Sequence, residues 1–311
     1  MPYPALTSSQ AGGALTSMEV QLSDGAPTVE RREDRWLVRL AGDRLAWFAA
    51  SAEGARQLAI ERRVLGLLAA RCSFQTPRVL AVDPEGDFDV RTLVPGTADP
   101  WTVFDRVRAD PRQASRIGAA VGAILIEQHT QVRASDVAGW LPRRPGWPET
   151  RDRIRPRLAT VGADGDLLAK ADEVLARYEA EPVSEGDRVL VHADLGLHNL
   201  AIDPASLVVR GVFDYGGAAW ADRHHDFRYL LLGGEDEAML DAALAVYEPA
   251  AGASISRRRV ALYNAACALS FLAHRAGTRP EERCCGRTLA EDLAWTRQAV
   301  DRTRALAGVG P

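Results

Sequence analysis

The sequence is nearly devoid of lysine, since Lys170 is the only lysine among its 38 basic residues. The other basic residues are arginines, which stay protonated at neutral pH, so chemistry that needs a neutral amine is almost excluded. The four cysteines have no C-x-x-C spacing, which argues against a zinc site or a disulfide framework and predicts a reducing, cytoplasmic setting. No apolar run approaches the length of a membrane span, and the N-terminus lacks the pattern of a secretory signal.

A basic surface is lacking as well. The formal net charge of -4 and the pI near 5.9 argue against nucleic-acid binding, which needs a basic surface or stripe. With 311 residues, 47% of them hydrophobic, the chain has enough core material for two packed lobes. Residues 1–17, rich in Ser, Thr, Gly and Ala, predict a flexible tail.

The hydrophobic pattern divides the rest of the chain in two. Residues 18–96 alternate short apolar runs with turn residues, which predicts a small antiparallel sheet. One helix interrupts this pattern, because Ile60, Val64 and Leu68 recur at helical spacing, with Glu61 at the edge of their apolar face. Residues 97–311 predict a mainly helical lobe that contains one pair of strands. The predicted fold class is therefore α+β.

Polar side chains follow two of the predicted strands of the helical lobe. In "VLVHADLGLHNLAID", His192, Asp194 and Asn199 follow an apolar run, and Asp214 ends a later strand in "GVFDYGGAAW". Phosphoryl transfer needs a carboxylate to orient the proton of the attacking hydroxyl, and oxygen ligands that hold magnesium against the nucleotide phosphates. Asp194 suits the first role, and Asn199 and Asp214 suit the second.

These two motifs carry a resemblance to a known family. "HADLGLHN" followed by "FDYGGAAWADRHHD" resembles the catalytic loop and the metal-binding segment of the aminoglycoside phosphotransferase and choline kinase-like family. The resemblance implies a protein kinase-like two-lobe fold, with a small antiparallel-sheet N-lobe carrying one helix and a larger, mainly helical C-lobe. It also implies that Asp194 is the catalytic base, that Asn199 and Asp214 bind Mg²⁺, and that His192 and Asp226 support the loop.

The resemblance extends to the nucleotide side of the predicted N-lobe. It implies that Glu61 is the helix glutamate that pairs with a phosphate-binding cation. It further implies a hinge-like segment over residues 91–96, which would bring Thr92 and Val94 to the bound nucleotide. The order of these parts along residues 18–305 agrees with that of the family.

Three departures from the family pattern are visible. The strand position that normally holds the cation falls at Trp47, unless the strand is "WLVRL", in which case Arg39 would supply the charge. The glycine-rich turn is reduced to Gly25. The histidine that the family often has two residues after the catalytic aspartate is replaced by Gly196, with His198 further on.

Together these features predict a kinase that moves the γ-phosphoryl group of ATP or GTP to a hydroxyl of a small molecule, with Mg²⁺ and without a nucleic-acid or membrane partner. Trp47 leaves an alternative open, a kinase-like binding protein with weak or no catalysis. The resemblance includes cationic amino sugars among the substrates. Two interpretations stay open for the acidic residues of the C-lobe, which would either hold such a substrate or form solvated helix faces: Glu235 to Glu237, Asp241, Glu281, Glu282, Glu291 and Asp292. Trp220 and Trp295 would either stack on the substrate or pack in the core.

Overall fold

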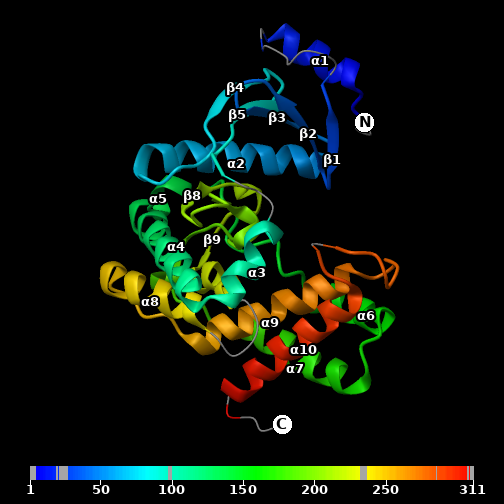
Figure 1. The fold of residues 1–311 in the computed structure, drawn as a ribbon, viewed down its shortest axis with the longest axis vertical. Helices are drawn as coiled ribbons and strands as arrows, with labels where there is room; N and C mark the ends of the chain where they lie inside the picture. The colour runs from blue at the N-terminus through cyan, green and yellow to red at the C-terminus, as the bar shows by residue number, and fades with distance from the viewer. Residues whose placement is uncertain are drawn as a thin grey trace.

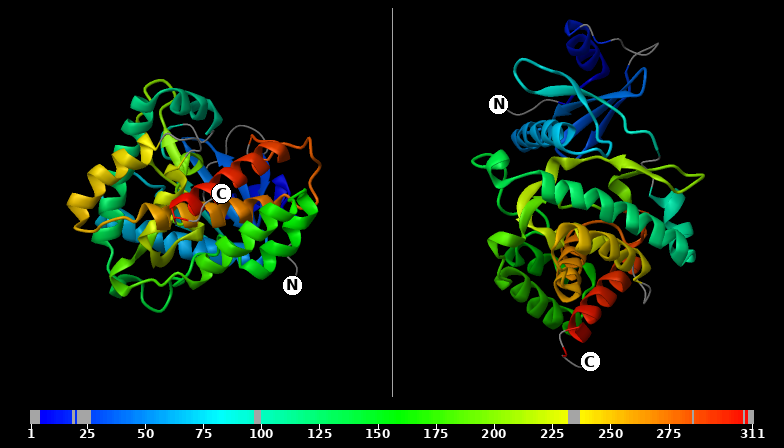
Figure 2. Two further views of the ribbon diagram at one scale, coloured as in Figure 1. Left: turned by 90° about the horizontal axis from the view of Figure 1, so that it is seen from below. Right: turned by 90° about the vertical axis from the view of Figure 1, so that its left-hand side faces the viewer.

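The computed structural model of the chain has two lobes stacked along its long axis (Figure 1). The upper lobe contains an antiparallel sheet and the lower lobe is mainly helical, as the right-hand view of Figure 2 also shows. The predicted α+β class and the division into a sheet lobe and a helical lobe are confirmed. The structure describes residues 5–18, 20, 27–96, 100–231, 237–284, 286–306 and 308.

The sheet of the N-lobe has five strands in the order β1-β2-β3-β5-β4, and its neighbouring strands are antiparallel. The strands are β1 (Val29–Arg32), β2 (Arg35–Leu40), β3 (Arg44–Ala49), β4 (Val79–Val82) and β5 (Phe88–Thr92). Alternate side chains point to opposite faces, so Val38 and Phe48 pack under one face. Trp47 lies on the opposite face, paired across the sheet with Leu37 and Asp89.

The prediction of a flexible tail over residues 1–17 is wrong for its second half, which forms helix α1 (Ser8–Ser17). Thr7 caps this helix in a reciprocal pair with Gln10, an arrangement that satisfies two otherwise unpaired backbone donors. Ala11 and Leu15 are fully buried against the sheet. The segment is rich in small residues, so its amphipathic pattern, with two buried side chains four residues apart, was not recognised in the sequence.

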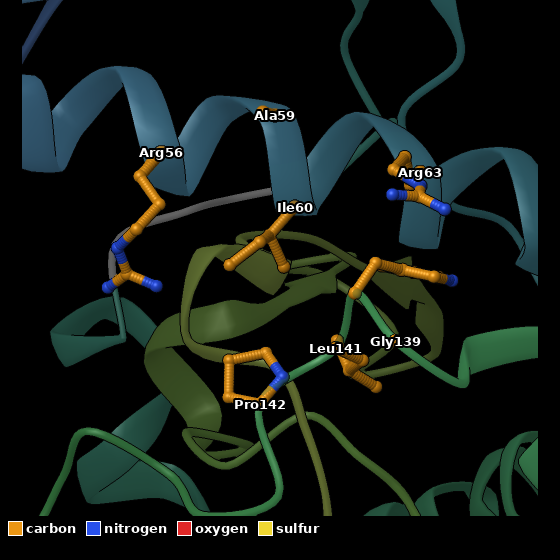
Figure 3. A pocket seen from close by; sticks show the side chains of 8 residues that line it. Arg56, Ala59, Ile60, Arg63, Gly139, Leu141 and Pro142 are labelled. Carbon is orange, nitrogen blue, oxygen red and sulfur yellow. The ribbon is translucent and has the colours of Figure 1, made fainter.

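The helix predicted around Glu61 is α2 (Ala52–Arg71), which lies between the sheet and the C-lobe (Figure 1). Ser51 caps it by accepting the N–H of Gly54 at 3.0 Å. A cavity of about 360 Å³ separates one side of α2 from residues 139–142 of the C-lobe (Figure 3). At its rim, the guanidinium of Arg63 lies 4.0 Å above the ring of Trp140. This contact ties α2 to the lower lobe.

The C-lobe is built around α9 (Arg257–His274), most of whose residues are buried. Helices α4 and α8 pack unusually closely, because a Cβ at Gly118 or Gly122 would collide with the backbone of α8. In the part of the chain that the structure describes, no helix has the length and apolar character needed to cross a membrane. The other helices are α3 (Trp101–Ala109), α4 (Pro111–Gln131), α5 (Ala134–Val137), α6 (Arg151–Leu158), α7 (Gly165–Ala180), α8 (Ala238–Ala251) and α10 (Leu289–Leu306).

Two short strand pairs at the top of the C-lobe place the polar motifs. Strand β6 (Arg188–Val191) pairs with β9 (Ala219–Asp222), and β7 (Leu200–Ile202) pairs with β8 (Val209–Val212). In the described part of this lobe, segments of 3-10 helix join the other elements. Four are three residues long, η1 (Ala159–Val161), η2 (Glu185–Asp187), η3 (Leu197–Asn199) and η4 (Tyr215–Gly217), and η5 (Arg223–Leu230) has eight residues. The polar residues predicted from the sequence therefore lie between β6 and β7 and directly after β8.

Candidate active site

The loop that follows β6 is held by one buried carboxylate, that of Asp226 on η5. Its oxygens accept the backbone N–H groups of His192 at 3.0 Å and Ala193 at 2.9 Å. They also accept hydrogen bonds from Gln128 and lie 3.1 Å from the ring of His129. Burial would raise the pKa of Asp226, but these partners outweigh burial and lower it, so the carboxylate is ionised at neutral pH.

The backbone of this loop is locally strained. Ala193 has a φ of 68°, a left-handed conformation that costs a non-glycine residue free energy and persists only where its surroundings enforce it. Two hydrogen bonds hold Ala193 in this conformation, because Asp226 accepts the N–H of Ala193 and the buried Arg228 donates to the carbonyl oxygen of Ala193. His192 adds a further contact, since its Nε2 lies 2.9 Å from the carbonyl oxygen of Phe213. The loop is thus fixed before any substrate binds.

The carboxylate of Asp194 projects from this fixed loop and is 42% exposed. Its Oδ2 accepts a hydrogen bond from the amide of Asn199 at 3.0 Å and lies 3.2 Å from Nε2 of His198. Partial burial would raise its pKa, but the positive charge of His198, with Arg228 and His192 behind it, outweighs burial and holds the pKa at about 2. Asp194 is therefore an ionised, accessible acceptor for a hydroxyl proton.

The departure at Gly196 has a structural explanation. A Cβ at residue 196 would lie 2.6 Å from Cε1 of His198 and 2.7 Å from its Nδ1. The glycine thus leaves the space in which the His198 ring reaches Asp194. Partial burial would lower the pKa of His198, but Asp194 outweighs burial and raises it. The contact between His198 and Asp194 was not predicted from the sequence. The sequence does show Gly196 at the position where the family often has a histidine, with His198 two residues further on.

Asp214 lies two residues after the end of β8 and brings a second carboxylate to the same edge. Phe213 donates its N–H to the carbonyl of Asn199 at 3.1 Å, which aligns the two segments. The amide nitrogen of Asn199 is engaged by Asp194, so its Oδ1 is the atom left to bind a cation. Among the described residues no three His, Cys, Asp or Glu side chains form a metal site by themselves. The pair Asn199 and Asp214 fits a magnesium ion whose remaining ligands are phosphates and water.

Glu61 faces this edge from α2, and its carboxylate is 2% exposed. It accepts the N–H of Tyr215 at 3.0 Å, next to Asp214. Two arginines pair with it, Arg91 on β5 at 2.7 Å and Arg35 on β2 at 3.0 Å. Arg35 also lies 3.0 Å from Oδ1 of Asp214. The helix glutamate, the strand cations and Asp214 therefore form one connected network.

Arg35 and Arg91, and not Arg39, pair with Glu61 in the structure, and binding of a nucleotide by Arg39 stays a prediction. Arg39 lies four residues along the same strand, paired with Leu45 across the sheet, and its side chain is exposed. Arg35 and Arg39 share a face of β2 by the two-residue period of a strand, so the sequence did not distinguish them. Arg91 was assigned to the hinge, and its buried partners are Asp89 on the same strand and Glu61 on α2, whose approach to β5 the sequence does not reveal.

The predicted hinge residues lie at and just beyond the end of β5. Thr92 ends β5, and its hydroxyl accepts the N–H of Arg78 at 2.9 Å. Val94 is buried, and its side chain lies against Gly211 of β8. The segment that connects the two lobes therefore packs on the β7–β8 pair. Gly25, the remnant of the glycine-rich turn, lies outside the described residues. Contact of Thr92 and Val94 with a nucleotide stays a prediction.

Most of the predicted acidic substrate residues that the structure describes are engaged by arginines. Arg257 pairs with Glu237 at 2.7 Å and also with Asp241. Asp292 is buried between Arg275 and Arg287, each within 2.6 Å. Glu291 accepts the backbone N–H of Thr288 as part of a helix cap and lies 3.8 Å from Arg283. Glu281 and Glu282 are exposed, whereas Glu235 lies outside the described residues.

The two tryptophans considered as stacking platforms pack within the protein. Trp220 is 8% exposed and belongs to the main core cluster. Trp295 is partly buried against Phe271, with the guanidinium of Arg287 4.7 Å above its ring. Of the two readings, core packing fits both residues.

The sequence comparison identifies the family. Residues 22–263 match the phosphotransferase enzyme family, and the chain belongs to that family. The streptomycin 3''-kinase of Streptomyces griseus is 38% identical to this chain over 86 residues, which are 28% of this chain and 30% of that enzyme. The chain thus matches less than a third of the length of this relative.

Solved structures show the same fold over nearly the whole chain. The GDP complex of wild-type aminoglycoside 2'-phosphotransferase-IIIa aligns with a TM-score of 0.69 at 18% identity, covering 96% of this chain and 99% of that one. A streptomycin–ATP ternary complex of APH(2")-IIa aligns with a TM-score of 0.62 at 13% identity, covering 95% and 97%. Macrolide 2'-phosphotransferase type I aligns with a TM-score of 0.59 at 16% identity, covering 96% and 98%. The predicted kinase-like fold and family are confirmed.

Proposed function

We propose that this protein transfers the γ-phosphoryl group of ATP or GTP to a hydroxyl group of a small molecule, with Mg²⁺ as the cofactor. The observation that carries the proposal is the meeting of three oxygen-bearing side chains at one edge of the C-lobe. Asp194 is accessible and ionised, and Asn199 and Asp214 stand beside it on aligned segments. Membership of the phosphotransferase family supports the same reaction class.

Each of these side chains has a definite role in the proposed reaction. Asp194 accepts a hydrogen bond from the substrate hydroxyl and orients its oxygen toward the γ-phosphorus. The Oδ1 of Asn199 and the carboxylate of Asp214 hold the metal. When bound, Mg²⁺ neutralises the charge of the transferring phosphate. Asp226 and His192 act through the loop, because they hold its backbone and not the reactants.

The proposed donor is a purine nucleoside triphosphate. Structural relatives have been solved with GDP and with ATP, which supports a nucleotide in the cleft between the lobes. We assign Thr92 and Val94 to the base end of this cleft, and ATP and GTP are both to be tested. Because such triphosphates are abundant in the cytoplasm, the proposal places the protein there.

The proposed acceptor is a hydroxylated small molecule, with cationic amino sugars as the first class to test. Relatives of this chain include a streptomycin kinase and phosphotransferases solved with kanamycin and with gentamicin, which supports this choice. The arginines that neutralise Glu237, Asp241 and Asp292 limit the carboxylates available to a cationic ligand. We assign Glu281 and Glu282 as the acidic pair for such a ligand, because both are exposed.

A phosphate-transfer assay tests the proposal. Purified protein is incubated with Mg²⁺, ATP or GTP, and a panel of amino sugars and uncharged sugars, and phosphorylated product is measured by mass spectrometry. We expect product with at least one hydroxylated acceptor, and no product with Asp194→Asn, whose nucleotide affinity should stay at the wild-type level. Equal product formation by Asp194→Asn would contradict the assigned role of Asp194. Absence of product with every acceptor, together with absence of nucleotide binding, would contradict the proposed reaction.

A further inference from the structure

The strand position expected to carry a phosphate-binding cation is occupied by Trp47 on β3. Trp47 lies between Leu37 of β2 and Asp89 of β5 in the sheet register, on the face that holds the partners of Glu61. An indole carries no charge and cannot neutralise a phosphate. The two arginines that pair with Glu61 differ in whether they are able to replace the missing cation.

Arg91 is fully engaged inside the sheet lobe. Its Nε and Nη2 donate to the carboxylate of Asp89 at 2.5 and 2.9 Å, and its Nη1 lies 2.7 Å from Glu61. The side chain is 1% exposed. All three nitrogens of the guanidinium are thus directed at buried carboxylates, and Arg91 serves to neutralise Glu61 and Asp89.

Arg35 lies at the boundary between this buried network and the open edge of the site. Its Nη1 donates to Glu61 and its Nη2 to Asp214, both at 3.0 Å. A guanidinium has five N–H donors, so these two bonds leave donors for another acceptor. Its Asp214 partner is 39% exposed and belongs to the proposed metal site. Arg35 therefore stands where metal-bound phosphates are expected.

Two neighbours shape the position of this guanidinium. Its central carbon lies 4.7 Å from the ring centroid of Trp47, a geometry in which the face of an indole attracts a cation. On another side, a Cβ at Gly216 would lie 3.4 Å from Nη1 of Arg35 and 3.6 Å from Oδ1 of Asp214. The tryptophan supplies a platform for the arginine, and Gly216 lies beside it at a distance where even a Cβ would make only ordinary van der Waals contact.

We propose that Arg35, held on the face of Trp47, is the phosphate-binding cation of this chain. The inference rests on the proposed function, because it assumes that a nucleotide triphosphate enters the site. Asp214 would hold the metal, and the N–H groups of Arg35 that face this carboxylate would be available to the phosphate oxygens, while Nη1 would stay on Glu61. The cation thus reaches the phosphates from β2, and β3 contributes the aromatic surface on which it rests.

Calorimetric titration with Mg·ATP and Mg·GTP tests this assignment. We expect Arg35→Gln to weaken binding of the triphosphate by about 10- to 100-fold, the range for loss of a charged hydrogen bond. The matched control is Arg32→Gln on β1, an exposed arginine that pairs with Glu30, and it should bind like the wild type. If Arg39→Gln loses binding and Arg35→Gln does not, the assignment of Arg35 is overturned.

A charge-swap variant separates phosphate binding from a structural effect. In the double variant Arg35→Gln with Trp47→Lys, the cation returns to β3, and we expect it to recover most of the lost affinity. Thermal melting of each variant shows whether it is folded, and Arg91 still neutralises Glu61 in all of them. A folded double variant that recovers no affinity would overturn the proposal. If the wild type itself binds neither nucleotide, the proposed function fails, and the inference fails with it.

Discussion

The Nε2 atom of His198 lies 3.2 Å from Oδ2 of Asp194, and the ring reaches this position because residue 196 is a glycine. A methyl group on Gly196 would press on the ring and displace it from the carboxylate. The backbone at this residue, with a φ of -119°, tolerates any side chain. We therefore predict that Gly196→Ala lowers kcat on the order of tenfold, the scale for misplacing a reacting group.

A double-mutant cycle checks that this effect passes through the histidine. His198→Ala should lower kcat by a similar factor, and Gly196→Ala should have no further effect in the His198→Ala background, because the added methyl group then has space. Additive losses in the cycle would show that Gly196 acts independently of His198.

The buried carboxylate of Asp226 should matter for the stability of the fold, in contrast to Asp194, which is assigned to catalysis. Asp226→Ala would leave the N–H groups of His192 and Ala193 without their acceptor inside the protein. We predict a loss of roughly 3–5 kcal/mol in the free energy of unfolding, as for breaking other buried charged networks. Urea denaturation measures it. Asp194→Ala is the comparison, because this half-exposed carboxylate should contribute about 1 kcal/mol or less. Equal losses in the two variants would contradict the structural role of Asp226.

Acid sensitivity should arise in part from His225. The ring is buried, stacked on Tyr263 with centroids 4.4 Å apart, and its Nδ1 lies 3.0 Å from the guanidinium of Arg228. Burial and the charge of Arg228 lower its pKa to about 3, against roughly 6.5 in the unfolded chain. Between these values the unfolded state binds the extra proton, so stability falls as pH falls from about 6.5 toward 3.

The contribution of His225 is measured by comparing the wild type with His225→Gln, which keeps a hydrogen-bond acceptor for Arg228. One such group changes the free energy of unfolding by at most about 1.4 kcal/mol per pH unit. Denaturation at several pH values should show a shallower acid limb in the variant. An identical slope in both proteins would mean that His225 is not held neutral by the fold.

The parts of the fold that were predictable from the sequence are those with a periodic pattern. The helical spacing of Ile60, Val64 and Leu68 located α2 to within a few residues, and the alternating runs located the N-lobe sheet. Helix α1 was not predicted because only Ala11 and Leu15 of its residues are buried, and two buried residues in a segment of small residues do not form a recognisable period. Tertiary contact with the sheet stabilises that helix.

The candidate site likewise contains residues that were predictable from the sequence and residues that were not. Asp194, Asn199 and Asp214 were predicted as candidates because they lie within a few residues of strands that the apolar runs of the sequence indicate. The network around Glu61 was not, because Arg35 lies 26 residues and Asp214 lies 153 residues from it along the chain, and only the assembled lobes bring the three together. Trp47 was recognised as a departure, but its position against Arg35 follows from sheet register.

Equilibrium binding of ATP and GTP, with and without Mg²⁺, to the wild type and to Asp214→Ala tests whether Asp214 is a metal ligand of a nucleotide site. We predict that Mg²⁺ strengthens binding of at least one nucleotide to the wild type, and that the variant loses this dependence because its metal site is incomplete. Binding that is independent of Mg²⁺ in the wild type, or equally dependent on Mg²⁺ in the variant, would contradict the assignment of Asp214 as a metal ligand and with it the proposed site.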